Sequence, residues 1–278
     1  KELFVNLTLR ELRSKYKRSV LGWAWSLLNP LTSLVIYGFV FSVIFGVEAP
    51  PGDPSGLDNF AMFLMCGLLP YNFLSNGLNG GMGALIGNGN LVKKVFFPRE
   101  ILVAASTASW LVSFLIELAV LAVALVFFGN VIVLWIPMVL ALVALEVVFV
   151  LGLALMLAAS AVYFRDLQHL LSIVLQVWFY SAPIVYPLSL VEEKLTSWQM
   201  TLYNLNPLTR FVEAFRDVMY DMRMPPLDEL GYLPLVSVLS LIALLGGIGL
   251  LFAAFGRWGR NLGWHGREQA TLSFRAPG

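Results

Sequence analysis

Six apolar runs, each long enough to cross a lipid bilayer, constrain this chain more than any other feature of its sequence. Spanning the hydrocarbon core takes about 20 apolar residues, and a helix satisfies every backbone hydrogen-bonding group within such a segment. The runs cover 28–47, 59–82, 101–128, 135–160, 168–188 and 231–256. Four of them contain no Asp, Glu, Lys or Arg, while the third contains Glu117 and the fourth Glu146. The sequence therefore predicts an all-α integral membrane protein with six transmembrane helices.

The amino-acid composition supports this prediction. Charged residues make up 13% of the chain and the mean hydropathy is +0.79, whereas a soluble domain carries about 25% charged residues. The single cysteine, Cys66, excludes an intramolecular disulfide and a cysteine-rich metal site. The N-terminal segment has a mixed polar pattern, so we expect no cleavable signal peptide.

The distribution of lysine and arginine predicts which side of the membrane each loop faces. Cytoplasmic loops of membrane proteins carry an excess of these two residues. Fourteen of the eighteen lie in the N-terminal segment, the 87–100 loop, the 161–167 loop and the tail, while four lie between the last two runs. We therefore expect a multi-pass protein with both termini in the cytoplasm and a basic cytoplasmic tail over 257–278.

Residues 1–22 are expected to form an amphipathic helix at the cytoplasmic interface of the membrane. Val5, Leu9 and Leu12 recur at helical spacing, while the basic side chains fall elsewhere around the helix. A soluble cytoplasmic helix is the alternative interpretation of the same pattern.

Two tryptophans, Trp23 and Trp25, follow this segment and mark the entry into the membrane. They suit the headgroup layer, where the amphipathic indole ring contacts both apolar lipid and polar surroundings. Asn29 and Pro30 then suit the cap and the first turn of the first membrane helix, because proline has no N–H to leave unpaired there. The six-helix transmembrane domain is therefore expected to cover 23–256.

The two membrane glutamates, Glu117 and Glu146, are expected near the middle of their helices, where an ionised side chain is costly. No lysine or arginine lies in any of the six runs to pair with them. Either both are protonated and hydrogen-bonded to neighbours, which makes them structural, or they face a hydrated path, which makes them substrate contacts.

The second run ends in a series of glycines interleaved with asparagines. Small residues stand four positions apart at 77/81 and at 83/87. This spacing is typical of helices that pack closely in membranes, and a hinge leading into the next loop is the alternative.

The loop over 88–100 predicts a short helix that starts at Asn90 and stops before Pro98, since the residue before a proline avoids the helical region. This helix would present two lysines and the pair Phe96–Phe97 to the cytoplasm. Exposed phenylalanines beside lysines indicate a surface for a partner protein or a contact with the membrane interface.

Two short amphipathic helices, over 190–203 and 207–222, are predicted on the outer side between the fifth and sixth runs. Ser189 and Glu192 have the spacing of a capping box, and the pair Asn206-Pro207 is a second helix start. Both helices are too short to span. They form either a re-entrant hairpin, which must be shielded by protein or line a cavity, or a hairpin that rests on the outer leaflet.

The sequence contains no motif of a nucleotide-binding loop, a zinc protease or a nucleophile elbow. Two functions from different classes remain. The chain is either a transporter subunit driven by a separate ATPase or an integral membrane enzyme that acts on a lipid-linked substrate. A secondary transporter is a weaker third interpretation, because such proteins usually carry charged or broken helices in both halves of a repeat.

The motif R-S-x-L-G-x-x-W over 18–25, followed by Pro30-Leu31, resembles the N-terminal signature of ABC-2 type permeases that export lipid-linked polysaccharides such as O-antigen, teichoic acid or galactan. The resemblance extends along nearly the whole chain. It implies a homodimeric permease of the bacterial inner membrane that works with two copies of an ATPase subunit, which binds the ATP and Mg²⁺. It implies no cofactor or metal in this chain, a polyprenyl-linked glycan as substrate, contact with membrane lipids and no nucleic acid.

The resemblance also assigns roles to particular positions. The interface helix and a coupling helix over 88–100 would contact the ATPase through Arg10, Arg13, Lys17, Lys93, Lys94, Val95, Phe96, Phe97 and Pro98. Gate helices within 190–222 would contribute Trp198, Phe211 and Phe215. Candidates for the substrate path are Trp23, Trp25, Tyr37, Phe41, Glu117, Glu146, Trp178 and Tyr180. Aromatic rings stack on sugar faces, and contacts worth only about 1 kcal/mol each allow a polymer to slide.

The exposed phenylalanine pair gives a first prediction. Replacing both residues, as Phe96→Ala with Phe97→Ala, removes the apolar contact with the partner and should uncouple the ATPase while the permease still inserts in the membrane. Substrate-stimulated ATP hydrolysis is the measurement, and an unchanged rate would contradict the coupling role.

Overall fold

The computed structural model describes residues 2–15, 24–46, 49–89, 91, 98–164, 166–224, 238–250 and 253. These residues form helices and the turns that connect them, with no strand among them, so the predicted all-α class is confirmed. The tail over 257–278 and the two ends of the predicted sixth span lie outside the described residues.

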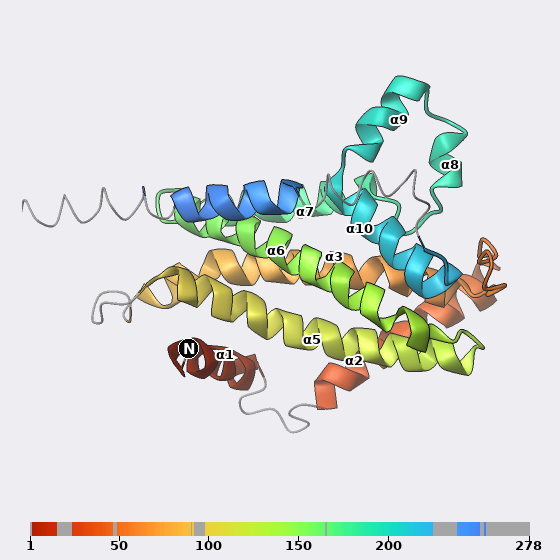
Figure 1. The fold of residues 1–278 in the computed structure, drawn as a ribbon, viewed down its shortest axis with the longest axis horizontal. Helices are drawn as coiled ribbons and strands as arrows, with labels where there is room; N and C mark the ends of the chain where they lie inside the picture. The colour runs from red at the N-terminus through yellow and green to blue at the C-terminus, as the bar shows by residue number, and fades with distance from the viewer. Residues whose placement is uncertain are drawn as a thin grey trace, which may run out of the picture.

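The helices form a bundle in which the longest members run alongside one another (Figure 1). In chain order they are α1 (Glu2–Lys15), α2 (Trp25–Tyr37) with a π-helical continuation (Gly38–Ile44), α3 (Phe60–Gly87), α5 (Glu100–Phe127), a 3₁₀ turn (Ile132–Trp135), α6 (Ile136–Ala161), α7 (Leu167–Ser181), α8 (Ser189–Glu192), α9 (Ser197–Asn204), α10 (Pro207–Arg216) with a π-helical turn (Asp217–Asp221), and the helix Val238–Leu250. α1 lies beside α5 at one end of the bundle, and α8 and α9 project at the other (Figure 1).

α3 is the central helix of the bundle. The side chain of Asn59 caps its start by accepting a hydrogen bond from the backbone N–H of Met62 at 3.3 Å, and every residue over 60–70 is buried. The helix packs against α5, α6 and α10. Burial on all sides explains why its apolar residues follow no single stripe.

The glycines of α3 serve two different purposes. A Cβ atom added at Gly77 would lie 2.6 Å from Cγ1 of Val150, and one at Gly81 would lie 2.6 Å from Cβ of Ala154. These glycines therefore let α6 approach closely, as the spacing predicts. The described residues give this interpretation no support at Gly83 and Gly87, because a Cβ at either position would meet no described atom within 4 Å.

Three helices among the described residues are long and apolar enough to cross a membrane: Trp25–Ile44, Glu100–Phe127 and Ile132–Ala161. The second and third agree with the predicted runs to within a few residues. The first begins at Trp25, so the predicted start at Asn29-Pro30 is wrong and Pro30 lies inside the helix. Membrane helices tolerate such a proline because neighbouring groups satisfy the freed backbone.

The predicted fifth span, 168–188, is longer than the helix that the structure contains. α7 ends at Ser181 and has 15 residues. Ala182 is extended, with φ −106° and ψ 150°, because the residue before Pro183 avoids the helical region. The chain over 182–188 therefore forms an irregular connection.

The outer hairpin confirms one predicted helix and corrects the other. α10 starts at Pro207, with Oδ1 of Asn206 accepting from the N–H of Leu208 at 3.1 Å, and its π-helical turn continues to Asp221. The single helix predicted over 190–203 is wrong, because α8 ends at Glu192 and a new helix begins at Ser197.

The predicted capping box at the start of this hairpin is also wrong, since no side chain caps α8. The box lies instead at Thr196 and Gln199, where Oε1 of Gln199 accepts from the backbone N–H of Thr196 at 2.9 Å. A second favourable start, within the same apolar pattern, divides the segment into two helices.

Close packing at Gly152 of α6 gives a second prediction. A Cβ at this position would overlap the backbone of Ala243 and Leu244 in the helix Val238–Leu250. Gly152→Ala should therefore cost about 1–3 kcal/mol by overpacking and lower the melting temperature of the purified full chain by roughly 5 °C. Gly249→Ala is the matched control, because its Cβ would meet no described atom within 4 Å. Equal melting temperatures for the two variants would contradict this packing.

Candidate functional site

Seven of the predicted site residues lie outside the described part of the chain: Lys17, Trp23, Lys93, Lys94, Val95, Phe96 and Phe97. Their roles stay predictions. Pro98, at the end of the same segment, is described and exposed.

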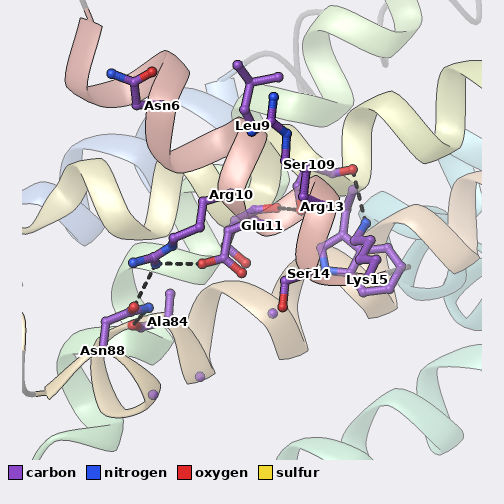
Figure 2. Close-up of a pocket in the computed structure, with 15 residues that line it drawn as sticks. Asn6, Leu9, Arg10, Glu11, Arg13, Ser14, Lys15, Ala84, Asn88 and Ser109 are labelled. Atoms are coloured by element: carbon purple, nitrogen blue, oxygen red, sulfur yellow. Dashed lines mark hydrogen bonds and ion pairs between the residues drawn. The ribbon is translucent and has the colours of Figure 1, made fainter. Parts of the chain in front are cut away.

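A cleft of about 990 Å³ lies between α1, the C-terminal end of α3 and the start of α5. Figure 2 shows that polar and charged side chains of α1 extend along one side of it. Its lining includes Arg10, Arg13 and Lys15 from α1, and Gly83 and Gly87 from α3. In this cleft the predicted interface helix therefore faces the glycines of α3.

Lys15 attaches α1 to α5. Its Nζ donates to the carbonyl of Ser109 at 3.0 Å and to Oγ of Ser113 at 3.2 Å, and it lies 3.4 Å from the centre of the Trp110 ring. Burial lowers the pKa of Lys15 to about 8, although Glu117 and Glu11 oppose this shift. The amine therefore stays mainly protonated at pH 7, which favours the cation–π contact.

The other basic residues of α1 are more open to solvent. Nη2 of Arg10 donates to Oε1 of Glu11 at 2.8 Å and to Oδ1 of Asn88 at 2.6 Å, as the dashed lines in Figure 2 show. Arg13 is exposed at the rim of the cleft and makes no ion pair with any described residue. The ATPase contact predicted for these two arginines stays a prediction.

The two membrane glutamates occupy different environments. Glu117 is half-buried on α5 and interacts electrostatically with Lys15, so a cation from α1 approaches it although no span supplies one. Glu146 on α6 is fully buried, and neither of its carboxyl oxygens has a hydrogen-bond partner among the described residues. The hydrogen-bonded interpretation of Glu146 therefore gains no support from the residues around it.

The aromatic path candidates do not gather at one place in the described chain. Tyr37 and Phe41 are half-buried at the end of α2, where the ring of Phe41 lies 4.8 Å from that of Phe60. Trp25 is 42% exposed and Tyr180 is 66% exposed. These four side chains belong to two separate parts of the bundle, α2 with its π-helical continuation, and α7.

Trp178 links α7 to the outer hairpin. Its Nε1 donates to Oδ1 of Asn206 at 2.7 Å, the same oxygen that caps α10. The indole ring also lies edge-on to Phe149, with centroids 6.4 Å apart. Trp178 therefore has a structural contact besides its predicted place on the path.

The predicted gate residues divide into an exposed tryptophan and two buried phenylalanines. Trp198 on α9 is 68% exposed. Phe211 and Phe215 on α10 are almost fully buried, with ring centroids 5.8 Å from Phe149 and 6.1 Å from Phe114 respectively. These phenylalanines anchor α10 to the bundle.

Arg216 is the residue of this region that sequence reasoning missed. It is 3% exposed, and its guanidinium donates to the carbonyls of Phe63 (3.4 Å), Ile184 (2.6 Å) and Pro183, and to Oε1 of Glu213 (3.2 Å). The group also stacks 3.8 Å from the Phe63 ring. One side chain thus joins α10, α3 and the connection after α7.

Two neighbours of Arg216 show how the site is built. A Cβ added at Gly67 of α3 would lie 3.1 Å from Nη2 of Arg216, so this glycine leaves room for the guanidinium. Burial raises the pKa of the Glu213 carboxyl to about 7, because the effect of desolvation is larger than the lowering effect of Arg216. Glu213 lies one helical turn before Arg216, a spacing that exposed ion pairs also have, and the three carbonyl partners are distant in sequence. No local pattern therefore separates Arg216 from an exposed arginine.

The described residues contain no group of three or more His, Cys, Asp or Glu side chains that could hold a metal ion. The basic cleft lies at the C-terminal end of α3, and Arg216 joins the outer hairpin to the helix near its start.

The family model described as ABC-2 type transporter matches residues 2–220. The chain belongs to the ABC-2 type transporter family. This ABC-2 transporter chain is 32% identical to the O-antigen export system permease protein RfbA of Myxococcus xanthus over 241 residues, which cover 87% of this chain and 89% of that protein. It is 29% identical to an RfbA permease of Klebsiella pneumoniae over 218 residues, covering 78% and 80%. It is 24% identical to the polysialic acid transport protein KpsM of Escherichia coli over 244 residues, covering 84% and 88%.

The contacts of Arg216 in this ABC-2 transporter chain give a third prediction. Arg216→Met leaves three carbonyls and Glu213 without their donor, so it should cost about 3–5 kcal/mol and lower the melting temperature of the purified full chain by roughly 10 °C. The matched control is Lys194→Met, since Lys194 is an exposed residue of the outer hairpin and exposed charges of this kind contribute at most about 1 kcal/mol. Equal melting temperatures for the Arg216 variant and the control variant would refute the stabilising role of the Arg216 contacts.

Proposed function

We propose that this chain is the transmembrane permease subunit of an ABC exporter that moves a lipid-linked polysaccharide across the bacterial cytoplasmic membrane. The observation that carries the proposal is its likeness, over 87% of its length, to an O-antigen export permease. Likeness to a polysialic acid transport protein supports a polymeric glycan as the cargo class. The lipid is proposed to be a polyprenyl carrier.

We further propose that a separate ATPase subunit supplies the energy and binds the ATP and Mg²⁺. The family and the likeness to permease proteins of export systems support this division of labour. The contact surface is proposed to comprise α1, through Arg10 and Arg13, and the coupling segment over 88–100. Both belong to the side on which most lysines and arginines gather, and we propose that both chain termini lie there, in the cytoplasm.

The translocation path is proposed to lie between two copies of the chain, each with six spans. Six helices enclose little space by themselves, and a symmetric pair is the commonest assembly. In the described bundle α3 fills the centre with buried side chains, which supports a path outside the single bundle. The outer hairpin α8–α10 is proposed to be re-entrant and to gate the outer end.

The alternative function is an integral membrane enzyme that acts on a lipid-linked glycan precursor. The fully buried, unpartnered Glu146 is the observation in its favour, because isolated buried carboxyls occur at catalytic sites. No second titratable or nucleophilic group of the described chain hydrogen-bonds to Glu146, whereas general acid–base chemistry needs such geometry. Export is therefore the better supported function.

A deletion experiment tests the proposal and separates the two functions. Cells that lack this chain should assemble the lipid-linked polysaccharide at full length but retain it inside, because export follows synthesis. The measurements are surface polysaccharide, detected on intact cells, and lipid-linked polymer extracted from the membrane. An inactivated ATPase subunit is the matched control and should give the same phenotype. A shortened or chemically altered polymer in the deletion strain alone would favour the enzyme and overturn the export proposal.

A further inference from the structure

The cleft beside α1 has an excess of positive charge. Arg10, Arg13 and Lys15 line it, and among its described lining residues the one carboxylate is that of Glu11. Arg10 and Lys15 already hold partners, whereas Arg13 makes no ion pair within the described chain. An anion at the rim would complete the coordination of this guanidinium, which suits phosphate geometry.

The opposite wall of the cleft, formed by α3, is open at Gly83 and Gly87, although Ala84 and Asn88 also line it. A Cβ added at Gly83 or Gly87 would meet no described atom within 4 Å, in contrast to Gly77 and Gly81, which α6 covers. Packing against the described helices therefore accounts for Gly80, which contacts α5, but not for Gly83 and Gly87, the other two glycines of the cleft. Their lack of side chains leaves the volume of about 990 Å³ accessible to a ligand.

The surroundings of the cleft favour a lipid over a soluble anion. Four apolar side chains of α1 are exposed, namely Leu3, Phe4, Val5 and Leu9, and Leu9 also lines the cleft. The helix lies against α5, one of the helices able to cross a membrane. A basic cleft beside exposed apolar residues matches a molecule with an anionic head and an apolar tail.

We propose that this cleft binds the phosphate headgroup of a lipid, with Arg13 as its principal ligand and the Gly83–Gly87 wall providing the space. The identity of the lipid rests on the proposed function, which supplies a polyprenyl diphosphate that carries the glycan. The phosphate chemistry is common to that carrier, to ordinary anionic lipids and to free pyrophosphate, so the test must separate these three sources.

The test measures lipid binding to the purified full chain by native mass spectrometry, without ATPase or polymer. The probes are a polyprenyl diphosphate, the uncharged polyprenol of the same length, phosphatidylglycerol and inorganic pyrophosphate. Polyprenyl diphosphate should bind at least about tenfold more tightly than each of the others, since a hydrogen bond to a charged group contributes about one decade of affinity.

Two variants locate the binding within the cleft. Arg13→Gln should weaken polyprenyl diphosphate binding about tenfold, and Gly83→Leu should weaken it by filling the space without meeting a neighbour. The matched controls are Lys194→Gln, an exposed lysine of the outer hairpin, and Gly249→Leu, whose side chain also starts in open space. Both controls should bind the lipid like the unmodified chain.

Several results would overturn the proposal. Equal binding of phosphatidylglycerol or of free pyrophosphate would reject a carrier site, and unchanged binding in both cleft variants would reject the location. Complete loss of lipid binding when purified ATPase subunit is added would mean that the ATPase, which we also propose to contact Arg13, occupies the cleft in place of a lipid. The binding assay does not depend on export. If the chain binds the lipid specifically but does not support export in cells, the proposed function is wrong and the proposed site still holds.

Discussion

The burial of α3 against α5, α6 and α10 is the interaction on which the rest of the structure depends. All residues over 60–70 are buried, and Gly77 and Gly81 let α6 approach where any Cβ would collide. Without a hydrophobic force between helices in lipid, such close contact is the main source of association. The positions of the neighbouring helices follow from it, because each packs on a different side of the same helix.

The two ends of α3 differ in how closely neighbouring groups pack against its glycines. Near its start, the guanidinium of Arg216 fills the space left by Gly67 and closes the junction of three segments. Roughly 25–30 Å further along, at about 1.5 Å per residue, Gly83 and Gly87 face open space. Small residues thus admit a fixed side chain at one end and leave a cleft at the other.

Sequence reasoning succeeded for long apolar runs and for an Asn-Pro helix start, and it failed where two local caps compete and where the contacts are tertiary. The bounds of α5 and α6 follow from continuous apolar runs, and the start of α10 follows from Asn206-Pro207. The break between α8 and α9 was missed, because Thr196 competes as a cap within one apolar pattern. The roles of Lys15 and Arg216 were missed because their partners, Ser109 and Phe63 among them, lie far away in sequence.

Lys15 decides how α1 relates to the membrane bundle. An amphipathic helix held only by apolar contacts could slide in the interface, but the Lys15 amine is fixed by Ser109, Ser113 and the Trp110 ring. The opposite walls of the cleft belong to α1 and α3, and α3 packs against α5. Any rotation of α1 about the Lys15 attachment must therefore move Arg13 relative to Gly83. If an ATPase contacts α1, as we propose, its contact surface and the lipid cleft share one helix and are mechanically linked.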